Sequence, residues 1–199
     1  AEKIIIEISS EPPELEGIHD IFIPEDPPYR MPIPIYRAGD RIGKPFIDMD
    51  PNKVVAILYS REEDSCAVFT EPDTVSKRIA DHILDFVMHE IRHDRMPPSL
   101  PWQSGVGDVA NAVLSGFIEN DFFHTIDIYS EVLQDAVLDL IDLGKVRAAS
   151  GSAMTLSHKA RDRFLNEIYR YRDKVVLRPV EISNAPEVVR RLGVIAINT

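Results

Sequence analysis

Apolar residues in the second half of the chain alternate between short continuous runs and longer stretches with helical spacing. The runs predict strands at 126–129, 146–149, 175–179 and 194–197, and the stretches predict helices at 108–118, 132–143, 159–171 and 186–192. Strands that alternate with helices of this length are typical of a largely parallel sheet covered by helices. We therefore expect an α/β fold here.

The first half of the chain has a different pattern. Apolar runs at 3–8 and 53–59 predict two strands, and apolar residues with helical spacing predict a long helix at 75–95. Between the two strands, residues 11–50 are rich in proline, which fixes φ and removes a backbone donor. We interpret this stretch as a long, ordered, extended excursion that lies on a larger body.

The ends of the chain and a proline pair suggest how the chain is organised. It opens and closes directly on apolar strands, whereas domains usually begin and end in polar segments, so we expect an internal fragment of a longer chain. Pro97 and Pro98 end the long helix, and we place a domain boundary within 95–101.

Composition narrows the classes of function. The 199 residues include 33 acidic and 22 basic side chains, and the formal net charge of −11 argues against nucleic-acid binding. No apolar stretch approaches the ~18–20 residues of a membrane span, and no polybasic run is present to hold a membrane surface. Cys66 is the only cysteine, which excludes an internal disulfide and favours a reducing, intracellular compartment.

The stretch Gly105-Val106-Gly107-Asp108 precedes a predicted helix. Glycines let a ligand approach the backbone, and the first N–H groups of a helix attract a phosphate, a carboxylate or a developing oxyanion. A plain tight connection explains the same two glycines equally simply. The full dinucleotide-binding spacing is absent, because Ala110 stands where the third glycine belongs and no strong strand is predicted before the turn.

Two polar residues fall at predicted strand ends. Glu131 follows the strand at 126–129, and carboxylates at the carboxyl ends of parallel strands can act as nucleophiles. The alternative is an acid that only stabilises a helix start. Asn184 follows the strand at 175–179, where its amide could orient a carboxylate or an acyl oxygen. Alternatively, Ser183 or Asn184 is an N-cap for the helix that begins at Pro186.

A third pattern, His89-Glu90-Ile91-Arg92-His93, is a formal H-E-x-x-H. On a helix the two imidazoles share a face and could bind zinc, with Glu90 as general base. A third ligand is missing from the expected places, since Ser99 occupies the metzincin position and Glu119 falls in another predicted helix. A solvated helix face is the simpler interpretation, and we expect no metal site.

Several motifs, taken together and in order, resemble one family. They are QSGVGDVANAVL (103–114), YSEVLQD (129–135), DLIDLGK (139–145), LRPVEISN (177–184) and RRLGVIAINT (190–199), with LEGIHDIFIP (15–24), PIPI (32–35) and GDRIG (39–43) in the first half. The combination resembles the acetyl-CoA hydrolase/transferase family and, within it, the succinyl-CoA:acetate CoA-transferase branch. The resemblance implies a CoA-transferase-like fold of the NagB/RpiA type, an open and mostly parallel sheet with flanking helices.

The resemblance also implies roles for particular residues. Glu131 matches the catalytic glutamate that forms a glutamyl-CoA thioester, and Asn184 matches the amide that holds the carboxyl substrate. The residues expected to bind CoA are Gly105, Val106, Gly107, Asp108 and Val109. One departure is Ala136, which stands where family members often have glycine.

The wider expectations follow from the same resemblance. Residues 1–98 would be the end of a first CoA-transferase domain with its connection and linker helix, and 99–199 the opening half of a second. The substrates would be acyl-CoA and a small carboxylate such as acetate or succinate, with no permanently bound cofactor. The full-length protein would be a homodimer in the cytoplasm, or in the mitochondrial matrix of a eukaryote. The alternatives are a zinc hydrolase that uses His89 and His93, and a non-catalytic interaction fragment.

Overall fold

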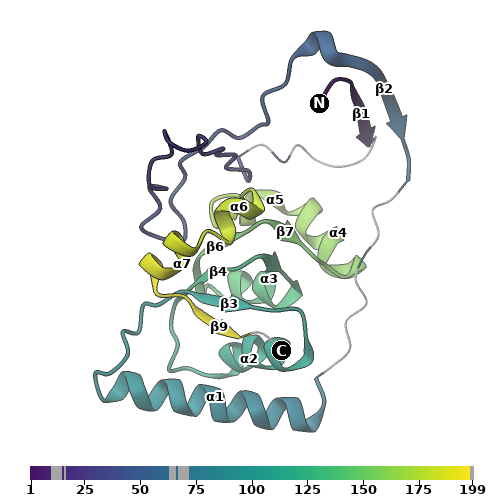
Figure 1. The fold of residues 1–199 in the computed structure, drawn as a ribbon. Coiled ribbons are helices and arrows are strands. Elements are labelled where there is room, and N and C mark those ends of the chain that lie inside the picture. Colours follow the sequence, from purple (N-terminus) through teal and green to yellow (C-terminus); the bar gives the residue numbers. More distant parts are fainter. Residues whose placement is uncertain (10–14, 16, 63–65, 67–71, 198–199) are drawn as a thin grey trace.

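The centre of the molecule is a five-stranded parallel sheet. The computed structural model describes residues 1–9, 15, 17–62, 66 and 72–197. In spatial order the strands are β8 (Val175–Leu177), β6 (Val146–Gly151), β4 (Ile126–Tyr129), β3 (Trp102–Ser104) and β9 (Ile195–Ile197). The chain runs outward from β3 to β8 and then returns to β9 on the other side of β3 (Figure 1). The predicted parallel α/β sheet is therefore confirmed.

One face of the sheet is covered by helices that follow strands β3, β4 and β6. They are α2 (Asp108–Glu119), α3 (Asp135–Asp142), α4 (His158–Asn166) and α5 (Ile168–Tyr171), with α1 (Thr74–Arg92) packed on the outside of α2. Their apolar faces meet alternate strand residues such as Ile126, Ile128 and Val175 in one buried cluster. Because every second strand residue points to this face, the opposite residues remain for a second core.

The second core lies on the other face, under α6 (Val180–Ser183) and α7 (Pro186–Leu192). Tyr129 and Ala148 reach it from the sheet, and Ile33 and Ile35 reach it from the proline-rich excursion. Both isoleucines are completely buried. The excursion is thus part of the layer that covers this face, as expected for an ordered segment that lies on a larger body.

The excursion is attached to the sheet through buried polar contacts. The guanidinium of Arg178, which follows β8, forms an ion pair with Asp20 and donates to the carbonyl of Ala38. Gly43 lies so close to the chain that a Cβ there would be 2.3 Å from the carbonyl oxygen of Ile21, so only glycine fits this contact. Residues 10–14 and 16, at the start of the predicted segment, lie outside the described residues.

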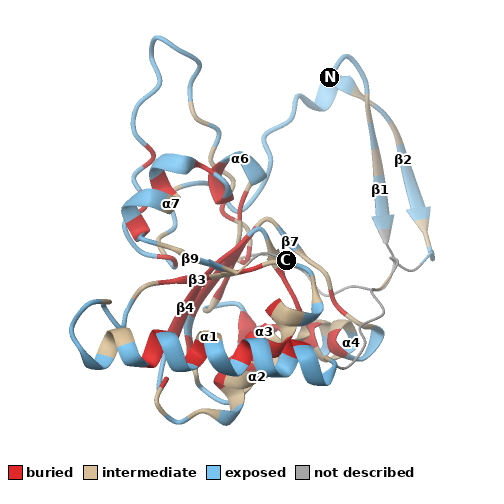
Figure 2. Ribbon diagram, turned by 60° about the horizontal axis from the view of Figure 1, so that its bottom comes forward, coloured by how far each residue is buried: buried red, intermediate tan, exposed pale blue. Residues whose placement is uncertain are grey.

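Two smaller parallel sheets complete the strands. In the first, β1 (Ile4–Ser9) pairs with β2 (Val54–Ser60), which follows the short 3-10 helix Pro51–Lys53. Figures 1 and 2 show this pair away from the central sheet, and its side chains Val55, Ile57 and Leu58 are all more than half exposed. In the second, β5 (Val132–Leu133) pairs with β7 (Ala153–Met154) beside the carboxyl ends of β4 and β6.

Most predicted elements are confirmed, with several corrections. The helix predicted at 132–143 begins with the strand β5, so α3 starts only at Asp135, and the helix predicted at 159–171 is broken at Glu167. Four elements were missed, the 3-10 helix Pro51–Lys53, the strand β3 before Gly105, the strand β7 and the single-turn helix α6. Among the described residues, no helix is long and apolar enough to cross a bilayer.

Lys145 closes the carboxyl end of α2. Its ammonium donates to the carbonyls of Phe117 at 3.1 Å, Ile118 at 2.9 Å and Asn120 at 3.1 Å. Replacing it with methionine keeps the aliphatic chain but removes all three charge-assisted hydrogen bonds. We expect Lys145→Met to lower the free energy of unfolding by about 1–3 kcal/mol, measured by urea denaturation. Lys77→Met, at an exposed position on α1, is the control and should change it by less than about 0.5 kcal/mol. Equal losses in the two variants would contradict this role.

Candidate active site

Glu131 lies in the short connection between β4 and β5, at the carboxyl edge of the sheet. Its carbonyl accepts hydrogen bonds from the backbone N–H of Ser152 at 2.8 Å and from the Ser152 hydroxyl at 2.9 Å. The preceding residue, Ser130, is buried and donates from its hydroxyl to the carbonyl of Ser104 at 2.9 Å. The backbone that carries Glu131 is therefore fixed to both neighbouring strands, while its side chain is exposed.

Gly151 makes this arrangement sterically possible. A Cβ at this position would lie 2.9 Å from Cγ of Leu133 and 3.3 Å from the carbonyl oxygen of Glu131. Any larger residue would push the end of β6 away from the connection that holds Glu131. Since α3 begins only at Asp135, Glu131 is outside the first helical turn. The interpretation of Glu131 as a helix-start acid is therefore wrong.

Asn184 approaches Glu131 from the opposite layer. Its side-chain Nδ2 donates to Oε2 of Glu131 at 3.1 Å, although 53 positions separate the two residues. Asn184 is the C-cap of α6, whereas Ala185 precedes α7 and no side chain caps that helix. The N-cap interpretation of Ser183 or Asn184 is thus wrong, and the amide is free to meet the carboxylate.

Tyr129 holds α6 in the place that brings Asn184 to Glu131. The tyrosine is 1% exposed, and its hydroxyl donates to the carbonyl of Ile182 at 2.8 Å. Burial raises the pKa of Tyr129 to about 12, so the phenol remains protonated and keeps donating at neutral pH. The sheet residue two positions before Glu131 therefore positions the helix that carries its hydrogen-bond donor.

The glycine turn at 105–107 lies between β3 and α2, beside the residues that flank Glu131. The N–H of Gly105 donates to the carbonyl of Ile197 at 2.8 Å, and this corrects the expectation that Gly105 offers a free donor. The N–H groups of Val106, Gly107, Asp108 and Val109 have no acceptor recorded within the described residues. These donors open α2, where the helix dipole favours an anion.

Gln134 was missed by the sequence reasoning, although it connects the turn to the Glu131 segment. Its side-chain Nε2 donates to the carbonyl of Gly105 at 2.8 Å, and the residue is only 2% exposed. The one signal in the sequence was a polar residue between a strand and an apolar helix, which is also the usual pattern of an exposed turn. Its burial becomes visible only when β3 and β4 are placed side by side.

The structure does not bring together a zinc site around His89, Glu90 and His93. Glu90 forms a bidentate ion pair with Arg95, in which Nε donates to Oε2 at 2.8 Å and Nη2 donates to Oε1 at 2.6 Å. This contact lowers the pKa of the Glu90 carboxyl. Nδ1 of His93 lies 2.8 Å from the carbonyl of His89. Within the ranges that the structure describes, no group of three histidine, cysteine, aspartate or glutamate residues could hold a metal.

The fold and the site together define a class of chemistry. An exposed carboxylate at the carboxyl edge of a parallel sheet, oriented by an amide and next to unengaged backbone donors, is suited to nucleophilic attack on an acyl group. The same edge is where open α/β sheets bind their ligands.

Known proteins with similar sequences perform acyl-CoA chemistry. No protein-family model matches the chain. Over its whole length the chain is 44% identical to a succinyl-CoA:acetate CoA-transferase of Clostridium kluyveri and 42% identical to an acetyl-CoA hydrolase of Schizosaccharomyces pombe. It is 39% identical to a propanoyl-CoA:succinate CoA transferase of Escherichia coli. The chain spans 37%, 38% and 41% of the length of these three relatives. It is therefore a homologue of one part of the CoA-transferases and acetyl-CoA hydrolases, which confirms the resemblance.

Solved structures share the fold at lower sequence identity. RipA from Yersinia pestis matches with a TM-score of 0.58 and 20% identity, over 74% of this chain and 32% of that one. A 4-hydroxybutyrate CoA-transferase from Porphyromonas gingivalis matches with a TM-score of 0.56 and 19% identity, over 74% of this chain and 36% of that one. The CoA-transferase-like fold is thus confirmed for the larger part of the chain.

The Tyr129 contact yields a prediction for stability and its dependence on pH. We expect Tyr129→Phe to lose about 1 kcal/mol at pH 7, because the buried carbonyl of Ile182 loses its donor. The folded protein also keeps the Tyr129 proton to a pKa of about 12, while the unfolded chain releases it near the ordinary tyrosine pKa of 10.0. The unfolded state therefore binds fewer protons in this window, and stability falls as the pH rises through it.

The variant should show a shallower fall over that window, measured by chemical denaturation at a series of pH values. Tyr169→Phe is the matched control, because Tyr169 is 70% exposed. The same alkaline slope in Tyr129→Phe and the wild type would contradict the assignment.

Proposed function

We propose that the whole protein is an acyl-CoA:carboxylate CoA-transferase or an acetyl-CoA hydrolase, with Glu131 as its nucleophile. The observation that carries the proposal is the exposed carboxylate of Glu131, held by the amide of Asn184 at 3.1 Å. Within the described residues no ion pair involves this carboxylate. The homology to CoA-transferases and acetyl-CoA hydrolases supports the same reaction class.

The first half of the reaction consists of two acyl transfers at Glu131. A carboxylate oxygen attacks the thioester carbon of acyl-CoA, the C–S bond breaks, and CoA leaves as the thiolate with an acyl-glutamyl anhydride behind it. The thiolate then attacks the Glu131 carbonyl of the anhydride and releases the acyl group as a free carboxylate, which leaves a glutamyl-CoA thioester. A second carboxylate takes CoA by the reverse steps, or water cleaves the thioester and completes a hydrolysis.

The neighbouring groups take defined roles in this scheme. Each attack places negative charge on a carbonyl oxygen, and the free N–H groups of Val106 and Gly107 stand at the adjacent turn to receive it. A preorganised donor of this kind contributes about 3–4 kcal/mol to such reactions. Asp108 and Val109 open α2 and add donors to the CoA-binding side. Gly105 contributes through its backbone position, since its N–H and its carbonyl are both engaged.

The remaining parts of the proposal concern the whole protein. We infer substrates of the acyl-CoA, acetate and succinate type, no permanently bound cofactor, no nucleic-acid or membrane partner, and a homodimer that works in the cytoplasm or the mitochondrial matrix. We also infer that 1–98 and 99–199 belong to two CoA-transferase domains. The separate β1–β2 pair supports two units, while the excursion and α1 pack on the second. We expect the isolated chain, about two-fifths of its relatives' length, to be inactive.

Replacing the nucleophile tests the mechanism. In the whole protein, Glu131→Gln should lower CoA transfer and acetyl-CoA hydrolysis by at least about 10⁴-fold, because the amide cannot form the anhydride. Peptide mass analysis after incubation with acetyl-CoA should find one CoA-sized addition on the wild-type peptide that carries Glu131, and none in the variant. Glu181→Gln, an exposed carboxylate on α6, should keep both activity and adduct. Full activity of Glu131→Gln would refute the assignment.

Asn184 is tested by removing its amide. We expect Asn184→Ala in the whole protein to reduce kcat/KM for the carboxylate acceptor by about 10–100-fold, the usual range for one hydrogen bond to a charged group. Asn184→Asp should lose more, because it sets a second negative charge beside Glu131. Steady-state kinetics with acetate at fixed succinyl-CoA provide the measurement. If both variants retain the wild-type kcat/KM, the amide has no part in holding the carboxyl group.

A further inference from the structure

The peptide group that joins Gly105 to Val106 is held from one side only. Its carbonyl accepts hydrogen bonds from Nε2 of Gln134 at 2.8 Å and from the Ser104 hydroxyl at 3.3 Å. Its N–H, which belongs to Val106, has no acceptor recorded in the described part of the chain. The carbonyl and the N–H of a trans peptide point in opposite directions, so the Val106 N–H is directed away from Gln134.

The preceding peptide group, by contrast, is held on both sides. The carbonyl of Ser104 accepts from the Ser130 hydroxyl at 2.9 Å, and the N–H of Gly105 donates to β9 at 2.8 Å. These bonds leave the next peptide plane free to turn, because glycine permits many backbone conformations. The Ser104 hydroxyl contact at 3.3 Å is longer than a normal O–H···O bond. The amide of Gln134 is therefore the main contact that sets the direction of the Val106 N–H.

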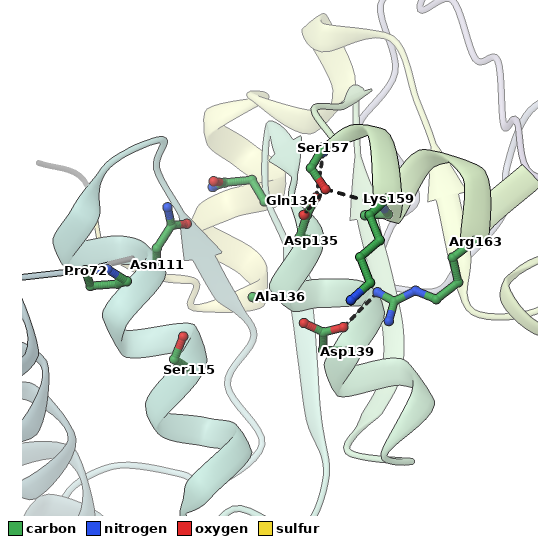
Figure 3. A pocket seen from close by; sticks show the side chains of 11 residues that line it. Pro72, Asn111, Ser115, Gln134, Asp135, Ala136, Asp139, Ser157, Lys159 and Arg163 are labelled. Atoms are coloured by element: carbon green, nitrogen blue, oxygen red, sulfur yellow. Dashed lines mark hydrogen bonds and ion pairs between the residues drawn. The ribbon is translucent and has the colours of Figure 1, made fainter. Parts of the chain in front are cut away.

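Gln134 is itself firmly placed. Its side chain is buried, and the next residue, Asp135, accepts from the backbone N–H of Ser157 at 2.9 Å and from its hydroxyl at 2.5 Å. These contacts tie the start of α3 to α4. Figure 3 shows the Gln134 side chain pointing from the start of α3 toward α2, away from Ser157. A side chain that is fixed in this way can hold another group in one orientation.

The hydrogen bond from Gln134 brings little net stability to the fold. The carbonyl of Gly105 can only accept, so the amide must present Nε2 to it. Oε1 is then left buried with no hydrogen-bond partner. Burying an unpaired acceptor costs at least as much as one neutral hydrogen bond contributes. Stability alone therefore does not explain an amide at this position, whereas its effect on the turn does.

We propose that Gln134 is a positioning residue, which holds the Val106 N–H as a donor to the oxyanion that forms when Glu131 attacks an acyl group. This inference rests on the proposed function and adds a residue to it. Gln134 acts through the Gly105 carbonyl in two ways. It fixes the plane of the peptide group, and it polarises that group, which makes the N–H at its other end a stronger donor. The donor is then in place before charge develops and needs no reorganisation.

Single-turnover kinetics on the whole protein test this role. The formation of the CoA adduct on the Glu131 peptide is followed by rapid quenching and mass analysis over a range of acetyl-CoA concentrations. Gln134→Met keeps the shape of the side chain, and we expect it to slow the saturated rate about 10–100-fold while the half-saturating acetyl-CoA concentration changes less than about twofold. Lys145→Met is the control, because it frees three carbonyls at the other end of α2 and should not slow the rate.

A second variant tests the donor itself. In Gln134→Glu the side chain keeps its length but donates to the Gly105 carbonyl only when it is protonated. Burial raises the pKa of such a carboxyl, so its protonated fraction grows as the pH falls from about 8 to about 6. The rate of Gln134→Glu relative to the wild type should therefore rise several-fold over this range, whereas the relative rate of Gln134→Met should stay constant. A purely structural role predicts no such difference between the variants.

The results separate this inference from the proposed function. The positioning role is overturned by a wild-type rate in Gln134→Met, by an equal loss in Lys145→Met, or by a relative rate of Gln134→Glu that does not change with pH. In each of these cases a CoA adduct on Glu131 of the wild type leaves the proposed function standing. A wild-type protein that forms no adduct and does not turn over acetyl-CoA overturns both.

Discussion

The buried ion pair between Arg178 and Asp20 is the contact on which the arrangement of the site depends. The two side chains are 2% and 1% exposed, and burial lowers the pKa of the Arg178 guanidinium while the Asp20 charge opposes that shift. Hydrogen bonds complete the pair, because Nε of Arg178 donates to Ser150 at 2.8 Å and Asp20 accepts from the backbone of Ile42 at 2.9 Å. A buried pair with all its partners is stable, whereas loss of either charge leaves the other uncompensated at a cost of about 3–5 kcal/mol.

The two sides of the site both lead back to this pair. On one side, Asp20 fixes the excursion, the excursion buries Ile33 and Ile35 under α6 and α7, and α6 presents Asn184. On the other side, Nε of Arg178 donates to the hydroxyl of Ser150 in β6. Ser152, which follows the end of β6, donates from its backbone N–H to the carbonyl of Glu131. The carboxylate of Glu131 and the amide of Asn184 therefore come from different layers, and their 3.1 Å contact depends on the packing of α6 against the proline-rich excursion.

The sequence predicted the parts of this structure that rest on local patterns. Continuous apolar runs identified β4, β6 and β9, and helical spacing identified α1, whose N-cap Asp73 accepts from the backbone N–H of Ser76 at 2.7 Å. The missed elements lack such patterns. The strand β3 is only Trp102-Gln103-Ser104, with no apolar run, and takes its conformation from its neighbours β4 and β9. Glu131 was found as a strand-end acid, but Gln134 and the engaged N–H of Gly105 depend on contacts between segments that are distant in the sequence.

This division of the site between layers bears on the choice between transfer and hydrolysis. In the proposed mechanism both outcomes share the glutamyl-CoA thioester, so the difference lies in whether water or a carboxylate reaches it first. In this chain the side chains of Glu131 and Asn184 are exposed, and the excursion packs beside them on the layer of α6 and α7. Whatever covers this surface in the whole protein must admit a carboxylate to the Asn184 amide and exclude water from the thioester carbon. Under the proposed mechanism, the choice between transfer and hydrolysis therefore depends on what covers Glu131 rather than on the carboxylate itself, and the relatives of this chain include both a CoA-transferase and an acetyl-CoA hydrolase.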